Sequence, residues 1–176
     1  FAHQQAGIKP DFLCLSKGIT GGTLPLSAVL TTDDVYAAFY DDAVARAFLH
    51  SHSYSGNPLA CRAAVATLEL FERLRAIEGN EELARALDDA FHPLAEHARV
   101  RHARRIGMIW AWDVDEAQPD FSARYHREAL KRGLLLRPIG QTVYAMPPYV
   151  LEPDDVRHLG QAAYGALEAT LKGETK

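Results

Sequence analysis

Cysteine, methionine and tryptophan are scarce in this chain, and it has no long apolar run. Its two cysteines, Cys14 and Cys61, are too few for the disulfide framework of a small secreted domain. Both lie in apolar stretches, so we expect buried, inert thiols in preference to catalytic or bridged ones. No apolar run reaches the length that spans a membrane, and no signal peptide is recognisable. We therefore expect a cytoplasmic protein without a membrane partner.

Excess positive charge is missing as well. The 176 residues include 19 lysines and arginines against 23 acidic residues, and the formal net charge is −4. The sequence has no basic block, so nucleic acid is not an expected partner.

His50 and His52 could share one face of a strand, but a metal site needs more ligands and no acidic or cysteine cluster lies near them in the sequence. We therefore expect no metal.

An initiator methionine is also absent. The chain begins with Phe1, Ala2 and His3, a stretch without the character of a domain start. Its first part contains only two clear strand patterns, which are too few to form an independent sheet. We therefore expect a fragment of a longer protein whose N-terminal part is missing.

What the sequence does contain is an alternation of strand and helix patterns, which predicts an α/β fold. Strands are predicted at residues 12–15, 24–30, 100–106, 108–114, 134–136 and 142–146. Helices are predicted at residues 32–40, 59–77, 81–97, 122–132 and 153–171. Gly79 and Asn80 are expected to separate the second helix from the third. The chain should have two parts, residues 1–71 and 72–176, with the long helix after Pro58 as the bridge between them.

Residues 12–15 form a short apolar run that predicts a buried strand, and Lys17 follows its end, where a turn rich in glycine begins. Strand ends that face a loop are where α/β proteins place their chemistry. Partial desolvation of a lysine at the edge of an apolar core disfavours its charged form and gives an amine that can act as a nucleophile or base. The spacing of the glycines matches neither a dinucleotide-binding motif nor a P-loop. A solvated loop lysine is the alternative.

Residues 50–57 form a polar loop of small side chains before the helix that Pro58 opens. Hydroxyls and backbone N–H groups at such a place suit an anion, most often a phosphate. The alternative is a plain capping loop in which Asn57 caps the helix.

Arg137 follows three leucines and precedes Pro138, at the end of a predicted buried strand. A buried arginine needs a partner, because an unpaired buried charge is costly. A carboxylate fits the guanidinium best, and it could come from an internal Asp or Glu or from a ligand. Tyr144, on the strand predicted to face Arg137, could belong to the core or line the same pocket.

Three segments, in order along the chain, resemble class III pyridoxal-phosphate-dependent aminotransferases. They are residues 10–22, residues 50–61, and residues 136–140 with 144–149. The resemblance implies an α/β fold of the type I pyridoxal-phosphate class. Residues 1–71 would then end the large cofactor domain, and residues 72–176 would form the small α+β C-terminal domain.

The resemblance also implies a role for each candidate residue. Lys17 would hold the pyridoxal 5′-phosphate cofactor as a Schiff base and then move the reacting proton. Ser53 would contact the cofactor phosphate of the neighbouring subunit in a homodimer, with His52 beside it. The small-molecule substrate would be contacted by the remaining candidates, Ser51, Arg137 and Tyr144, with Arg137 on its carboxylate.

Within the family, the segments are most similar to members that convert 8-amino-7-oxononanoate to 7,8-diaminononanoate in biotin biosynthesis, with S-adenosylmethionine or lysine as amino donor. Another class III enzyme acting on an ω-amine, and a binding module that has lost the cofactor, are the rival hypotheses. Family members pair the pyridine nitrogen with an aspartate that lies further upstream than this chain extends, so the fragment alone is expected to be inactive. Some relatives carry glycine, proline and threonine at positions 51, 52 and 53, and Ser53 keeps the hydroxyl.

Overall fold

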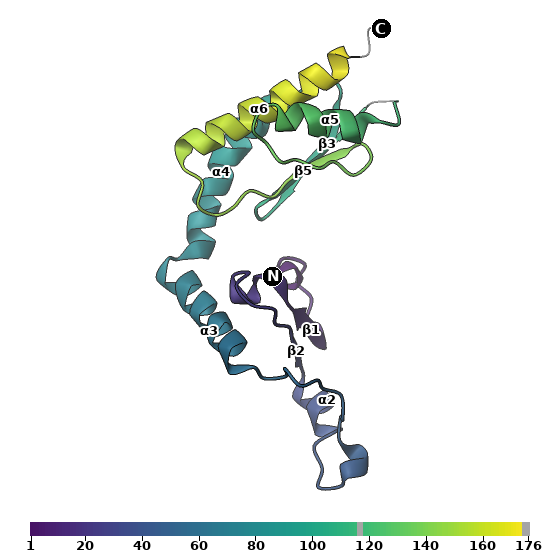
Figure 1. The fold of residues 1–176 in the computed structure, drawn as a ribbon, viewed down its shortest axis with the longest axis vertical. Coiled ribbons are helices and arrows are strands. Elements are labelled where there is room, and N and C mark those ends of the chain that lie inside the picture. The colour runs from purple at the N-terminus through teal and green to yellow at the C-terminus, as the bar shows by residue number, and fades with distance from the viewer. Residues whose placement is uncertain (116–117, 174–176) are drawn as a thin grey trace. The chain divides into compact units, whose positions relative to one another are not determined.

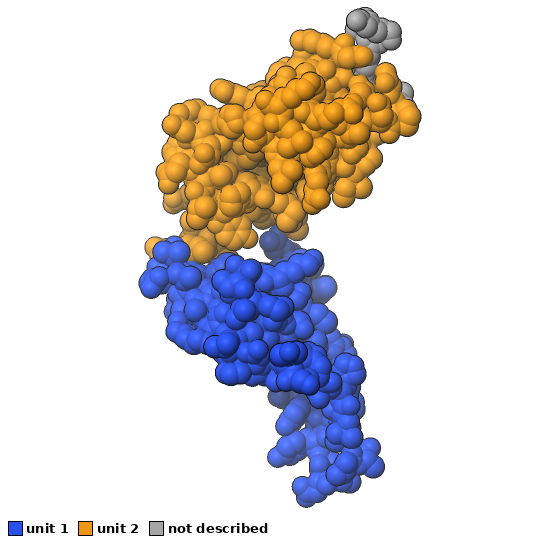
Figure 2. All heavy atoms as spheres, viewed as in Figure 1, with its two compact units in different colours: residues 1–74 blue, residues 75–176 orange. Residues whose placement is uncertain are grey.

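The computed structural model describes residues 1–115 and 118–173. The chain divides into two compact units, Phe1–Leu74 and Arg75–Lys176 (Figure 2). Helices and strands alternate in both units, which confirms the α/β expectation (Figure 1). No helix in the described part of the chain combines the length and the apolar character needed to cross a bilayer.

The first unit is built on a small antiparallel sheet and one long helix. Its elements are α1 (Ala2–Gln5), β1 (Phe12–Leu15), the 3-10 helix η1 (Lys17–Thr20), β2 (Ala28–Thr31), α2 (Asp33–Ala37), the 3-10 helix η2 (Val44–Arg46) and α3 (Pro58–Arg73). Strands β1 and β2 pair antiparallel, with Phe12 opposite Thr31 and Leu15 opposite Ala28. Helix α3 packs against η1, which begins two residues after the last residue of β1.

The two strands of this unit are mostly exposed, and the prediction of a buried first strand is wrong for this structure. Phe12 is 57% exposed and Val29 is 62% exposed. Cys14 and Cys61 are also exposed, contrary to the expected buried thiols. The physical reason is that a sheet of two strands is too small to cover its own faces, so an apolar sequence there does not guarantee burial.

The long helical region breaks earlier than the sequence indicates. Helix α3 ends at Arg73, and α4 (Ala76–Ala95) begins after Arg75, whose φ of 48° lies in the left-handed region. Gly79 and Asn80, the predicted break, lie inside α4. A glycine in a helix costs only about 1 kcal/mol relative to alanine, so packing of α4 can override it.

Among its described residues, the second unit contains a three-stranded sheet with three helices. After α4 come β3 (Val100–Ile106), β4 (Ile109–Val114), α5 (Phe121–Leu130), β5 (Thr142–Ala145) and α6 (Pro153–Lys172). The sheet order is β3-β4-β5 with both pairs antiparallel. Helix α6 packs against both α4 and α5. The core includes Leu87, Phe91, Trp112, Val114, Phe121, Tyr125, Val143 and Leu167.

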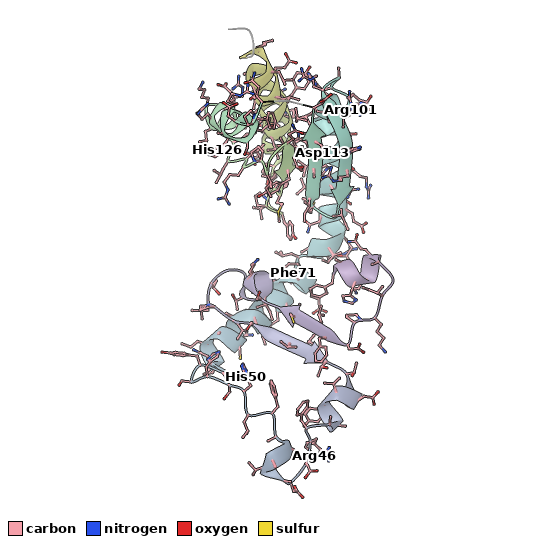
Figure 3. The ribbon with its side chains drawn as sticks, turned by 90° about the vertical axis from the view of Figure 1, so that its right-hand side faces the viewer. Arg46, His50, Phe71, Arg101, Asp113 and His126 are labelled. Carbon is pink, nitrogen blue, oxygen red and sulfur yellow. The ribbon has the colours of Figure 1, made fainter. Side chains whose placement is uncertain are left out.

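Strand β3 is at the edge of this sheet and contains an irregularity. Its register with β4 shifts between Arg101 and Arg104, and His102 within the shift has a φ of 50°. Every residue of β3 after Val100 is exposed. Arg104 and His102 both reach Asp113 on the neighbouring strand (Figure 3 labels Asp113). The edge strand is therefore bulged and carries mostly basic, solvated side chains.

The strand predicted at residues 134–136 is absent, although its burial pattern is that of an extended chain. Leu134, Leu136 and Pro138 are buried, whereas Leu135, Arg137 and Ile139 are exposed. The segment joins β5 through a tight turn in which Ile139 and Thr142 exchange two backbone hydrogen bonds of 2.8 and 3.0 Å. The residues therefore alternate between buried and exposed as in a strand, but the segment forms no ladder of backbone hydrogen bonds with a neighbouring strand among the described residues.

Candidate active site

Lys17 is the first residue of η1, and only Ser16 separates it from the end of β1. Its φ is 52°, in the left-handed region that residues other than glycine seldom occupy. Such a conformation costs a side-chain-bearing residue on the order of 1–2 kcal/mol, and strain of this kind clusters at functional sites. Lys17 is exposed, so the partial desolvation expected from the sequence is not found. The cause is the same open strand pair that leaves Phe12 exposed.

The turn that follows Lys17 is held by side-chain hydrogen bonds. Thr20, which is buried, donates from its hydroxyl to the Leu24 carbonyl at 2.6 Å. Thr23 donates to the Thr20 carbonyl at 2.8 Å. Gly21 has a φ of 60°, and a Cβ placed on it would come within 3.3 Å of the Thr67 hydroxyl on α3. The two hydrogen bonds stabilise the glycine-rich turn internally, and the close approach of Gly21 to Thr67 packs the turn against α3.

The loop of residues 50–57 is structured by its own side chains. The Asn57 side-chain oxygen accepts from the backbone N–H groups of Leu59 at 3.0 Å and Ala60 at 3.4 Å. This is the capping alternative considered from the sequence, in which the Asn57 side chain accepts hydrogen bonds from the backbone N–H groups of the first turn of α3. The His52 N–H donates to the Ser55 hydroxyl at 3.2 Å, and the His52 Nδ1 accepts from the Tyr54 N–H at 3.1 Å. The backbone of His52 therefore already has a partner within the loop.

Ser51 and Ser53 differ from their neighbours in this loop. Both are exposed, and neither hydroxyl has a hydrogen-bond partner among residues 1–115 and 118–173. A phosphate accepts several hydrogen bonds, and solvated hydroxyl donors of this kind can supply them. The exposed amine of Lys17 suits the aldehyde of pyridoxal phosphate, and the serine hydroxyls suit its phosphate. The residues present therefore fit the cofactor that the sequence suggests.

Arg137 and Tyr144 lie in the second unit, on either side of the tight turn before β5. Arg137 is exposed, and its guanidinium has no acidic partner in the described part of the chain. The internal Asp or Glu considered from the sequence is thus not found, and an exposed arginine does not need one. Tyr144 is half-buried on β5, opposite Ala111 of β4. Arg137 is available for an external carboxylate.

Sequence reasoning missed the residues that shape these two places. Ser55 orders the loop of Ser51 and Ser53, and Ser122 and His126 of α5 bond to the chain on either side of Arg137. For Ser122 and His126 the sequence offered one signal, because a serine and a histidine four positions apart in a predicted helix share one face. Over the residues described, no cluster of three or more His, Cys, Asp or Glu side chains is arranged to hold a metal ion.

Comparison with known proteins places this chain in a family. The family model for class-III aminotransferases matches residues 1–167, so the chain belongs to the class-III aminotransferases. A protein of Helicobacter pylori described as adenosylmethionine-8-amino-7-oxononanoate aminotransferase is 45% identical over 98% of this chain. The match covers 41% of that protein, so the chain spans about two fifths of the length of this relative.

Solved structures show the same fold. Adenosylmethionine-8-amino-7-oxononanoate aminotransferase from Methanocaldococcus jannaschii superposes with a TM-score of 0.84 at 34% identity, over 92% of this chain and 39% of the other. An amine transaminase from an uncultivated Pseudomonas species, solved in a form with bound pyridoxal phosphate, superposes with a TM-score of 0.85 at 29% identity, over 97% of this chain and 41% of the other. The α/β fold expected from the sequence is therefore that of transaminases.

Proposed function

We propose that the full-length protein is a pyridoxal-phosphate-dependent aminotransferase that converts 8-amino-7-oxononanoate to 7,8-diaminononanoate in biotin biosynthesis, in the cytoplasm. The observation that carries this proposal is the 45% identity, over 98% of the chain, to a protein described by that activity. The exposed Lys17 amine in a constrained backbone conformation and the Arg137 guanidinium, which is unpaired among the described residues, supply two of the groups that such a reaction requires.

Lys17 is proposed to hold the cofactor and to move the reacting proton. When bound, pyridoxal phosphate supplies an electron sink for the carbon that loses its proton. A primary amine can take that proton and return it, which a permanently charged guanidinium cannot do. The hydrogen-bonded turn after Lys17 would keep the amine at one place during both transfers.

The loop before α3 is proposed to bind the cofactor phosphate. The Ser53 hydroxyl would donate a hydrogen bond to the phosphate of the cofactor bound by the neighbouring subunit in a homodimer, and Ser51 would contact the substrate. The free hydroxyls of both residues support this assignment. His52 would act beside Ser53 by holding the loop, since its N–H and Nδ1 are engaged with Ser55 and Tyr54.

Arg137 is proposed to bind the carboxylate of the oxononanoate. A guanidinium can donate two parallel hydrogen bonds to a carboxylate, which fixes orientation as well as adding binding energy. Tyr144, on the other side of the tight turn, would line the same pocket. In this proposal residues 1–71 end the large cofactor domain and residues 72–176 form the small domain.

The amino donor is proposed to be S-adenosylmethionine, with lysine as the alternative. The rival function is transamination of an ω-amine, which is favoured by the fold shared with an amine transaminase at a TM-score of 0.85. The 45% identity to the Helicobacter pylori oxononanoate enzyme, against 29% to this amine transaminase, favours the biotin-pathway reaction.

A coupled assay on the full-length protein tests the proposal. The acceptor is 8-amino-7-oxononanoate, and S-adenosylmethionine and lysine are tried separately as donors. Formation of 7,8-diaminononanoate with either donor supports the biotin-pathway reaction and identifies the donor. No product with either, from a protein that still transfers amines from ω-amino acids, would overturn the substrate assignment and leave the ω-amine reaction.

A further inference from the structure

The chain on either side of Arg137 is extended but belongs to no strand. Residues 134–139 alternate between buried and exposed, and Arg137 is on the exposed side. Without a neighbouring strand, the backbone carbonyls along the edges of this segment need other hydrogen-bond partners. A buried carbonyl without a partner costs about 1–3 kcal/mol.

Two side chains of α5 supply those partners. The Ser122 hydroxyl donates to the Pro138 carbonyl, with 2.7 Å between the oxygens. The His126 Nδ1 lies 2.7 Å from the Leu136 carbonyl oxygen, and since a carbonyl only accepts, Nδ1 carries the hydrogen. The two carbonyls belong to the residues immediately before and after Arg137.

The spacing of these contacts matches on both elements. Ser122 and His126 are four residues apart, so they lie on one face of α5 (Figure 3 labels His126). Leu136 and Pro138 are two residues apart, and in an extended chain the carbonyls of alternate residues point the same way. Two donors on one helix face therefore meet two acceptors on one edge of the segment.

This double attachment determines which way Arg137 faces. In an extended chain, a rotation or a slip of one residue exchanges the buried and exposed sides. Holding the carbonyls of Leu136 and Pro138 against α5 keeps those two residues in the core and Arg137 in solvent. The direction of the guanidinium is thus determined by groups that do not touch it.

We propose that Ser122 and His126 are positioning residues that orient Arg137 toward the substrate carboxylate. The inference rests on the proposed role of Arg137 in binding the keto acid. Neither Ser122 nor His126 contacts the substrate in this arrangement. Their effect reaches the reaction through the backbone of residues 136–138, and it concerns only the substrate that Arg137 binds.

Steady-state kinetics of the full-length holoenzyme test this. Ser122→Ala and His126→Leu each remove one donor and are expected to lower kcat/KM for the keto acid about tenfold, the effect of one lost hydrogen bond. The resemblance implies a ping-pong reaction, in which kcat/KM for each substrate reports only its own half-reaction. The value for the amino donor should therefore stay unchanged, because Arg137 is proposed to bind only the keto acid. Ser122→Thr and His126→Asn return a donor at a similar distance from Cβ and should restore the keto-acid value. Arg127→Ala, an exposed position of the same helix, is the matched control.

The Arg137→Ala variant separates this inference from the proposed function. Alone it should lower kcat/KM for the keto acid on the order of a hundredfold. Added to Arg137→Ala, the Ser122→Ala change should have no further effect on that value, because the group it orients is gone.

Three outcomes would contradict the inference or the function on which it rests. If Arg137→Ala lowers the keto-acid value selectively and Ser122→Ala does not, the positioning role alone is overturned. It is also overturned if Ser122→Ala lowers kcat/KM equally for both substrates. If Arg137→Ala has no selective effect, the carboxylate assignment itself is overturned. If His126→Leu does not fold, the Ser122 variants decide the question.

Discussion

Thr142 donates its hydroxyl hydrogen to the Asp113 carboxylate from the opposite position on the neighbouring strand, with 2.7 Å between the two oxygens. This hydrogen bond, followed by those from Arg104 and His102, lowers the pKa of Asp113 below its usual value of 3.8. The side chain is 30% exposed, so solvent weakens these interactions only in part. A depressed pKa means that the stabilisation is present above the unfolded pKa and is lost as the pH falls through the folded pKa.

Thr142→Val should therefore destabilise the protein at neutral pH and do so less in acid. We expect a loss of about 1 kcal/mol at neutral pH, the net value of one hydrogen bond. Thermal unfolding of the full-length protein, measured from neutral pH downwards, gives the difference between variant and parent at each pH. Thr31→Val removes a hydroxyl that donates to the Asp11 carbonyl and is the control, because its acceptor does not titrate. A Thr142→Val effect that is constant with pH would contradict the assignment.

Substitution of Lys17 should abolish turnover more completely than it weakens cofactor binding. Lys17→Ala and Lys17→Arg both remove an amine that can take and return a proton, and proton transfer by a positioned group is worth on the order of 10²–10⁴ in rate. The measurements are the turnover of the full-length variants and their cofactor content after dialysis. Lys9→Ala, at another exposed lysine of the first unit, should retain activity. Appreciable turnover in either Lys17 variant would refute the role.

The two free serines of the loop before α3 should separate cofactor binding from substrate binding. Ser53→Ala removes a donor to a charged phosphate and should weaken pyridoxal-phosphate binding about tenfold to a hundredfold. Ser51→Ala should instead raise the KM for a substrate and leave the cofactor affinity near that of the parent. Titration of the apoprotein with pyridoxal phosphate measures the first effect. Equal cofactor affinities in the two variants would contradict the division of roles.

Two glycines of α6 should respond differently to the same substitution. A Cβ on Gly160 would overlap the backbone carbonyl of Ala90 on α4, which cannot move without displacing the helix. Gly160→Ala should cost about 1–3 kcal/mol through overpacking. A Cβ on Gly165 would come within 3.0 Å of the Arg132 Nε, the end of a flexible side chain. Gly165→Ala should be neutral or stabilising, because alanine is favoured over glycine in a helix by about 1 kcal/mol. Equal melting temperatures for the two variants would show that the α4–α6 contact is loose.

Periodic patterns predicted the second unit well. The alternation in β4 buries Trp110, Trp112 and Val114, and the first-turn Pro153 marks the start of α6 as expected. The prediction at residues 134–136 was wrong in element type because an alternating pattern specifies an extended chain, whereas a strand also needs a neighbour. Local patterns contain no information on whether that neighbour exists.

The same limit explains the errors in the first unit. Apolar residues around Cys14 predicted a buried strand, but burial depends on elements packed above it, and the strand pair alone leaves the face open. The break at Arg75 was missed because arginine has no sequence signal for the left-handed conformation that it adopts there.

For the candidate site, residue types were readable from sequence and their partners were not. Asn57 was correctly identified as a possible helix cap, since asparagine before Pro58 has a local signature. The attachment of Leu136 and Pro138 to His126 and Ser122 joins segments 10 to 16 residues apart, and no periodicity encodes it. The roles of the site residues stay predictions until the variants are measured.

The bulge at His102 has a consequence for how the protein behaves at high concentration. The outer side of β3 presents backbone groups that could pair with a strand of another molecule. The register shift between Arg101 and Arg104 interrupts the straight row of groups that such pairing needs, and the arginines would meet their own like charges across a symmetric contact. Molecules crowded together thus find no continuous template at this edge, and growth of a shared sheet from one copy to the next is blocked at its first step.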